Sequence, residues 1–263
     1  MKMRSCAVSG MFYPKDPSHL EQLLETFFSS VKPEKINPHG IVSPHAGYIY
    51  SGQVAAHAFG TLDPDFSGTF IVIGPSHRGY LTCVSKIPWE TPLGIMDIDE
   101  ELADATNLRV DEAAHAGEHS IEVQMPFIKY RFPRARVVPV MMGEQDYANA
   151  RQLAEQLAGA IRNTKRAVKI VASSDFSHYV PAPVAKENDL YAIEPLMTLD
   201  TKEFYRRIEE RSVTCCGYGP ISAMIMTCET SGATRARLIT YATSGDVTGD
   251  NREVVGYAGI AVI

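Results

Sequence analysis

The chain has 263 residues, of which 45% are hydrophobic and 21% are charged, and its formal net charge is −6. This length suits one large α/β domain, and we expect a single domain over residues 1–263. The acidic balance and the lack of a Lys/Arg run argue against a nucleic-acid partner, and no window approaches the ~18 consecutive apolar residues of a membrane helix.

Short apolar runs alternate with longer helical stretches along the chain, a pattern typical of βαβ organisation. The helices that we expect are 18–30, 51–59, 121–130, 147–162, 186–197, 202–210 and 219–229. The strands that we expect are 40–43, 69–73, 136–142, 168–172, 236–242 and 254–263, with a hairpin within 83–97. The pattern predicts an α/β fold in which helices flank a central, mostly parallel or mixed sheet.

The five cysteines are an odd number and are scattered along the chain. Free thiols in a reducing cytoplasm fit this usage better than a disulfide framework. The N-terminal residues carry no long apolar run, so they make a poor signal peptide and we expect a cytoplasmic protein. The sequence leaves the oligomeric state open, a homo-oligomer included.

Three histidines follow apolar runs in the same way. Gly40–His45 ends in Ser-Pro-His, Phe70–His77 ends in Pro-Ser-His, and Ile170–His178 ends in Asp-Phe-Ser-His. The carboxyl ends of parallel strands meet at one edge of a sheet, where ligands bind, so these imidazoles can converge. Neutral imidazole binds zinc, copper, iron and nickel. Taken alone, each histidine fits a loop residue that caps a helix or pairs with a carboxylate, but the set of three favours a site.

The remaining histidines lack this strand-end context. His119 precedes the expected helix 121–130 and has two interpretations of equal weight. It is either an acid/base group that faces the same pocket or a helix-start residue that balances local acids. We interpret the other four as structural: His19, His39, His57 and His115.

Two histidine ligands need a further donor, and residues 213–220 supply the adjacent thiols of Cys215 and Cys216 at a turn before an expected helix. A helix N-terminus and a metal both lower a thiol pKa, so a cysteine here can act as a thiolate. The alternative is that both cysteines pack as small hydrophobes. Gly217 and Gly219 match part of the dinucleotide-binding motif, but the third glycine of the motif is missing and no clear strand precedes these residues.

Five motifs together resemble the Memo family, whose bacterial and archaeal members are called AmmeMemoRadiSam system protein B. The resemblance extends from Phe12-Tyr13 to Tyr257-Ala258-Gly259, and the order of the motifs matches the family. The motifs are Pro44-His45-Ala46-Gly47-Tyr48, Gly74-Pro75-Ser76-His77, Glu118-His119-Ser120-Ile121-Glu122, Ser173-Ser174-Asp175-Phe176-Ser177-His178 and Cys216-Gly217.

The resemblance implies a fold similar to that of class III extradiol dioxygenases, which bind Fe(II) through two histidines and a glutamate. It implies that the Memo family keeps the histidines and has a cysteine in place of the carboxylate, so that the metal ligands are His45, His77 and Cys216. Asp175, His178 and His119 match the surrounding pocket positions. Cys215 is an extra thiol next to the matching one.

A thiolate is softer than a carboxylate, favours copper or zinc, and can itself be oxidised, so ring-opening chemistry does not follow from the fold. Three functions remain open. The first is an iron or copper oxidoreductase for an unknown small substrate, with His178 as acid/base, Asp175 orienting it and His119 nearby. If residues 175–178 turn helically, Asp175 and His178 share a face and can interact. The second is a zinc-type hydrolase or transferase. The third is a catalytically silent pocket that binds a small ligand or a peptide segment, since animal members have been viewed as signalling adaptors.

Overall fold

The computed structural model describes residues 2–32 and 36–263, and most of its strands form one mixed sheet. The described strands of this sheet are β1 (Gly40–Ser43), β2 (Thr69–Pro75), β3 (Cys83–Val84), β6 (Arg136–Met142), β7 (Val168–Ser173), β8 (His178–Val180), β9 (Ala236–Thr243) and β10 (Val254–Val262). Their order is β3-β6-β2-β7-β1-β10-β8, and β9 pairs with β10. β4 (Trp89–Thr91) and β5 (Gly94–Met96) form a separate hairpin within the segment where one was expected.

The centre of the sheet is parallel. β6, β2, β7 and β1 pair in parallel with one another, whereas β3 and β10 join antiparallel at the two sides. Every residue of β1 and β2 is buried. Strands that are covered on both faces consist of nearly continuous apolar runs, and these two strands show that pattern. The expectation of a mixed sheet with a parallel part is confirmed.

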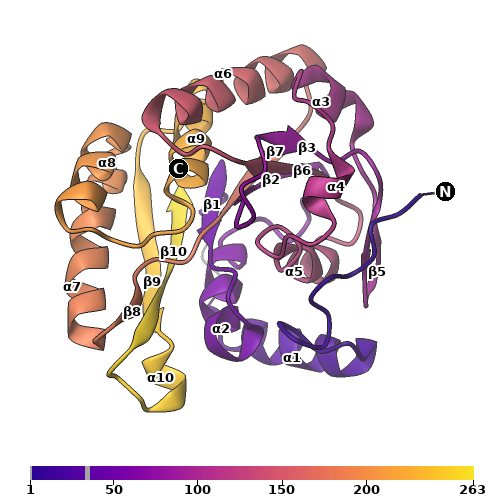
Figure 1. Cartoon of the computed structure of the whole chain (residues 1–263). Helices are drawn as coiled ribbons and strands as arrows, with labels where there is room; N and C mark the ends of the chain where they lie inside the picture. The colour runs from indigo at the N-terminus through magenta and orange to yellow at the C-terminus, as the bar shows by residue number, and fades with distance from the viewer. Residues whose placement is uncertain (1, 33–35) are drawn as a thin grey trace.

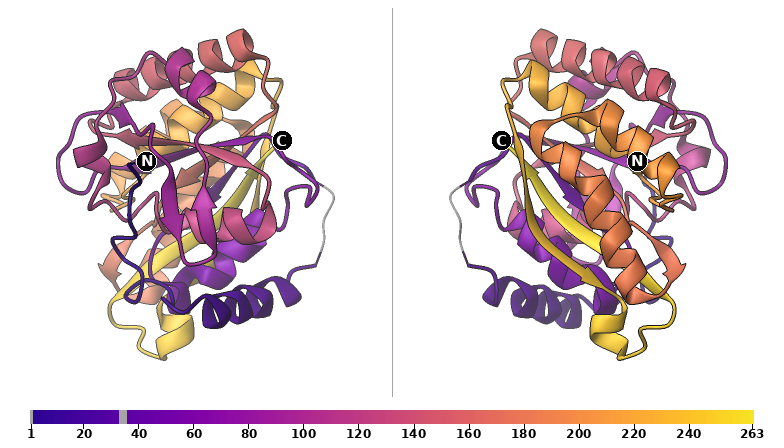
Figure 2. Two further views of the ribbon diagram at one scale, coloured as in Figure 1. Left: turned by 90° about the vertical axis from the view of Figure 1, so that its right-hand side faces the viewer. Right: turned by 90° about the vertical axis from the view of Figure 1, so that its left-hand side faces the viewer.

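Helices cover both faces of the sheet (Figures 1 and 2). The described helices are α1 (Pro17–Ser29), α2 (Tyr48–Phe59), α3 (Glu100–Ala105), α4 (Glu112–His115), α5 (Gln124–Arg131), α6 (Tyr147–Thr164), α7 (Ala182–Ile193), the 3-10 helix η1 (Glu194–Thr198), α8 (Thr201–Glu210), α9 (Tyr218–Thr230) and α10 (Gly245–Thr248). α2 packs on β1, β9 and β10 with α1 beneath it, while α9 packs on β7 and β2 with α6 above it. Within the described ranges, no helix is long and apolar enough to cross a membrane.

Some helices start where they are expected and others do not, and local interactions explain both outcomes. α6 starts at Tyr147 as expected, because the Asp146 carboxylate accepts hydrogen bonds from the N–H groups of Ala148 and Asn149. α5 starts at Gln124 instead of residue 121, since the preceding residues form turns. The short helices α3 and α4 were not expected, because a few residues carry too little periodic signal.

The strand register places the functional motifs at one edge of the sheet. Ser43, the last residue of β1, pairs with Ser173, the last residue of β7. β2 lies on the other side of β7 and runs parallel to it. The segments that follow these three strands therefore leave the sheet at neighbouring points, and His45, His77 and Asp175 lie on them.

Candidate metal centre

His45 lies two residues beyond β1 and is almost completely buried, with 2% of its surface exposed. Its backbone N–H donates to Oδ1 of Asp175 at 2.8 Å, which fixes the turn after the strand. Its ring nitrogen Nδ1 lies 3.0 Å from Oγ of Ser173. With Nδ1 occupied inside the protein, Nε2 is the nitrogen left for a ligand.

His77 follows β2 and is held by one carboxylate. The Glu118 carboxylate accepts the backbone N–H of His77 at 2.9 Å, and its other oxygen lies 2.9 Å from Nδ1 of the same residue. This oxygen also accepts the N–H of Ser120 at 3.0 Å. A histidine whose Nδ1 faces a carboxylate is the usual arrangement for a metal ligand that binds through Nε2.

Cys216 reaches the same point from the loop before α9. Its Sγ lies 3.2 Å from Nε2 of His45, and the backbone N–H of Asp175 donates to this sulfur at 3.2 Å. The loop can approach because Gly217 follows. A Cβ on this glycine would lie 2.5 Å from the carbonyl oxygen of Ser173.

His45, His77 and Cys216 each offer a ligand atom, and these three atoms all lie within 4.8 Å of one another. Two imidazole nitrogens and one sulfur form a donor set that suits zinc, copper or iron. Ligands at about 2.0 Å and about 2.3 Å in tetrahedral geometry are separated by about 3.5 Å, so the 3.2 Å between Nε2 of His45 and Sγ of Cys216 needs only a small adjustment. The residues present fit a metal ion.

Cys215 points elsewhere, although it is adjacent to Cys216. Its Sγ lies 3.2 Å from Oγ of Ser174 and is buried. Among the described residues, the clusters suited to a metal include Cys216 but not Cys215.

The helical turn that would place Asp175 and His178 on one face is absent. The segment between β7 and β8 is not helical, and His178 is the first residue of β8. Its N–H donates to Oγ1 of Thr214 at 2.7 Å, and its Nδ1 lies 2.9 Å from the Thr214 carbonyl oxygen. The pairing of β8 with β10 draws this histidine into extended structure, so Thr214 orients it instead of Asp175.

His119 lies in the turns before α5 and faces the other histidines. Its ring stacks on that of His77, with centroids 4.5 Å apart, and lies 5.4 Å from that of His45. Together with His77 and Glu118 it forms a second cluster of ligand atoms within 4.8 Å. The Glu118 oxygens already accept hydrogen bonds from protein N–H groups, so this carboxylate orients His77 better than it could bind an ion.

Burial keeps His45 and Cys216 neutral in the metal-free protein. Burial, and then the neighbouring imidazoles of His119 and His77, lower the pKa of His45 well below its usual value. Burial, and then the Asp175 carboxylate, raise the pKa of Cys216 well above its usual value. A neutral imidazole is ready to bind a metal, whereas the thiol must release its proton to the solvent when a metal binds.

The two carboxylates of the site differ in pKa. Burial raises the pKa of Asp175 to about 6, and the N–H of His45 offsets only part of this effect. Burial alone would also raise the pKa of Glu118, but hydrogen bonds from His77 and from the N–H of Ser120 lower it to about 2. Glu118 is therefore ionised at neutral pH, whereas the pKa of Asp175 lies close to neutral pH.

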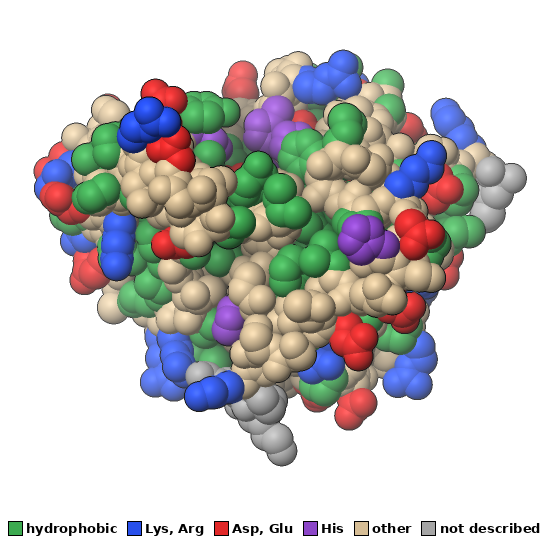
Figure 3. All heavy atoms as spheres, turned by 90° about the horizontal axis from the view of Figure 1, so that it is seen from below, with side chains coloured by type: hydrophobic (Ala, Val, Ile, Leu, Met, Phe, Trp, Pro, Cys, Tyr) green, Lys and Arg blue, Asp and Glu red, His purple; other side chains and the backbone are tan. Residues whose placement is uncertain are grey.

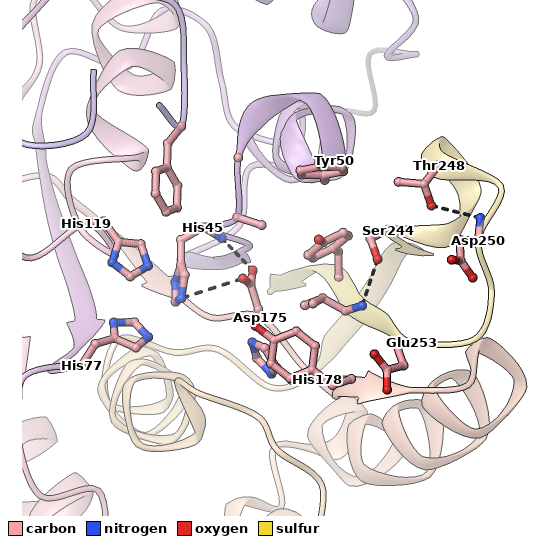
Figure 4. A pocket seen from close by; sticks show the side chains of 16 residues that line it. His45, Tyr50, His77, His119, Asp175, His178, Ser244, Thr248, Asp250 and Glu253 are labelled. Atoms are coloured by element: carbon pink, nitrogen blue, oxygen red, sulfur yellow. Dashed lines mark hydrogen bonds and ion pairs between the residues drawn. The ribbon is translucent and has the colours of Figure 1, made fainter. Parts of the chain in front are cut away.

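A cavity of about 760 Å³ opens in front of these side chains. Figure 4 shows the histidines and Asp175 at one end and Tyr50, Ser244, Thr248, Asp250 and Glu253 at the other. Aromatic rings of Phe12, Tyr50, Tyr179 and Tyr257 also line it. Seen from below, the molecule presents hydrophobic side chains near the centre of this face, with histidines among them (Figure 3).

Sequence reasoning missed the residues that hold the ligands. Glu118 stands directly before His119, so a search for an acid beside a histidine could have found it. Ser173 belongs to one of the family motifs but received no role of its own, and Gln124 gave no signal, because a serine at a strand end and a glutamine in a helix are common. Arg4 gave none either, although it donates to the Glu118 carbonyl at 2.8 Å and pairs with the buried Glu122.

Comparison with known proteins identifies the chain's family. The family model described as Memo-like protein matches residues 4–261. The chain belongs to the Memo family. Two similar relatives are MEMO1 family proteins of Methanosarcina barkeri, 44% identical over 99% of this chain and 100% of the relative, and of Methanosarcina acetivorans, 44% identical over 100% of both. A third, from Methanothermobacter thermautotrophicus, is 42% identical over 97% of this chain and 99% of the relative. The resemblance read from the motifs is confirmed.

Proposed function

We propose that this Memo-family protein binds a redox-active metal, iron or copper, through His45, His77 and Cys216, and acts as an oxidoreductase on a small substrate. The convergence of the three donor atoms within 4.8 Å carries the proposal. Hydrogen bonds hold each donor residue, so binding requires little rearrangement. Such a metal would supply a Lewis-acidic centre able to exchange electrons with a bound molecule.

The chain's own groups complete the site. Asp175 donates its N–H to the sulfur of Cys216, which stabilises the thiolate that metal binding requires. His178 lines the cavity and has Nδ1 committed to the Thr214 carbonyl, so its Nε2 is the atom that can exchange a proton with a substrate. His119 also lines the cavity and can donate to or accept from a ligand next to His77.

The size of the cavity supports a small molecule as substrate. Its volume of about 760 Å³ lies within the range of small-molecule pockets, about 300–1,000 Å³. Its walls combine aromatic rings with a few polar groups, the usual composition of such pockets.

A binding module is the second candidate. Met11, Ile49 and Val247 are large, exposed apolar residues, and each stands next to or close to a cavity-lining residue in the sequence. Exposed apolar side chains near a pocket mouth favour capture of a peptide segment. A zinc-type hydrolase is the third candidate, since the same donor set accepts zinc.

Elemental analysis of anaerobically purified protein tests these alternatives. Iron or copper near one equivalent per chain, with matching optical or paramagnetic resonance spectra, supports the oxidoreductase. Zinc alone favours the hydrolase. Failure to bind any of the three metals, even on titration under reducing conditions, would leave the binding module. Anaerobic handling matters because air can oxidise the Cys216 thiolate.

A further inference from the structure

Ser173 occupies the centre of a buried hydrogen-bond network behind His45. Its Oγ lies 2.6 Å from the carbonyl oxygen of Ser120, 2.8 Å from Nε2 of Gln124 and 3.0 Å from Nδ1 of His45. The side chains of Ser173 and Gln124 have no solvent exposure, and His45 has 2%. The hydrogen positions therefore follow from the protein groups that surround this hydroxyl.

Only one assignment of hydrogens satisfies all three contacts. The Ser120 carbonyl can only accept, so the single hydrogen of the Ser173 hydroxyl points to it. Nε2 of Gln124 also lies 2.9 Å from the carbonyl oxygen of Pro44, which fixes its amide group as the donor on this side. Gln124 then donates its second hydrogen to Ser173.

The Ser173 oxygen has no hydrogen left for His45. It can only accept from the imidazole, so Nδ1 of His45 carries the proton and Nε2 keeps its lone pair. This lone pair faces the sulfur of Cys216 at 3.2 Å, at the position of the proposed metal.

We propose that Ser173 is a positioning residue that holds His45 as its Nδ1–H tautomer and so presents Nε2 to the metal. The value of this arrangement for metal binding rests on the proposed function, but the tautomer itself does not. His77 reaches the same result by a different route, because its Nδ1 faces the charged Glu118. The centre thus has one histidine backed by a neutral hydroxyl and one backed by a carboxylate, and the carboxylate makes its imidazole the stronger donor.

The first test determines the tautomer of His45 in the metal-free protein. Histidine labelled with 15N and a long-range 1H–15N spectrum distinguish a protonated ring nitrogen from one with a free lone pair, and a His45→Ala spectrum assigns the signals. We expect Nδ1 protonated and Nε2 unprotonated at neutral pH. A His45 in the Nε2–H form, or one averaging between both forms, would overturn the proposal without any change to Ser173.

The second test removes the hydroxyl. We expect Ser173→Ala to mix the two tautomers of His45 and to weaken Zn²⁺ binding by about 10–100-fold in a chelator competition. Ser222→Ala is the matched control, because it deletes another buried hydroxyl, which donates to the Tyr218 carbonyl in α9 and lies beside the Tyr205 hydroxyl instead of a histidine. An unchanged tautomer and affinity in folded Ser173→Ala would refute the role. A parent protein with the expected tautomer but no metal affinity would instead refute the metal function alone.

Discussion

Nε2 of His45 lies 3.2 Å from Sγ of Cys216, although 171 positions separate the two residues in the chain. Asp175 joins them. Its carboxylate accepts the N–H of His45, and its own N–H donates to the sulfur of Cys216. Because β1 and β7 end at paired residues, the turn after one strand meets the loop after the other, and the cysteine loop packs onto both.

The two adjacent cysteines should behave differently when replaced. Cys216→Ser removes the sulfur beside His45 and should lower metal content to a small fraction of the parent value. Cys215→Ser should leave it near the parent value, because the Cys215 thiol faces Ser174. Elemental analysis of both variants, purified anaerobically in parallel, measures the difference.

Thermal unfolding of the metal-free variants is the control for this comparison. Cys215 is buried, so its replacement can lower stability without touching the metal site. Equal loss of metal from two folded variants would show that both sulfurs bind or that the assignment to Cys216 is wrong.

His178→Ala should leave the metal in place. His178 is outside the clusters of ligand atoms found in the described residues, and its contacts are with Thr214. We expect metal content within about twofold of the parent, because its loss removes a proton carrier and no ligand. His57→Ala, in the last turn of α2 and not among the residues that line the cavity, is the matched control. A folded His178→Ala protein that lost its metal would make His178 a ligand.

The strand ends could be predicted from sequence because parallel strands buried on both faces are continuous apolar runs. β2 shows this most clearly, since all of its residues are buried and His77 lies two residues beyond its last residue, Pro75. The pairing of Ser43 with Ser173 then follows from the topology of the sheet. The sequence therefore locates His45 and His77 well.

The supporting network could not be predicted, because it depends on long-range contacts. Arg4 lies over the Trp89 ring and pairs with the buried Glu122, a contact that spans more than a hundred positions. Local spacing also misled the interpretation of His178. An acid three residues before a histidine predicts contact only in a helix, and pairing with β10 makes this residue the start of a strand.

Glu118→Gln should weaken metal binding by about 10–100-fold, because His77 loses the carboxylate at Nδ1. The change should also alter acid stability. The pKa of Glu118 falls from 4.5 to about 2 on folding, so this carboxylate stabilises the fold above pH 4.5, and the contribution disappears as the pH falls toward 2. The variant should show a smaller loss of stability over that window.

Chelator competition with Zn²⁺ measures the affinity, and urea unfolding at several acidic pH values measures the stability. Glu25→Gln, an exposed glutamate on α1, is the control and should change neither quantity. An affinity for Zn²⁺ equal to that of the parent would mean that Glu118 has only a structural role.

Asp175→Asn should stabilise the metal-free protein at neutral and alkaline pH. Burial raises the pKa of Asp175 from 3.8 to about 6, so the folded state holds this proton more tightly than the unfolded state. Its contribution to stability is complete below pH 3.8 and is lost as the pH rises through 6, where the buried carboxylate becomes charged. An asparagine stays neutral, and its amide oxygen can still accept the N–H of His45. We expect a gain on the order of 1–3 kcal/mol at about pH 8 and little or none at about pH 4, measured by urea unfolding in the presence of a chelator. A gain that is independent of pH, or a loss at pH 8, would show that Asp175 is not a charge whose burial costs stability.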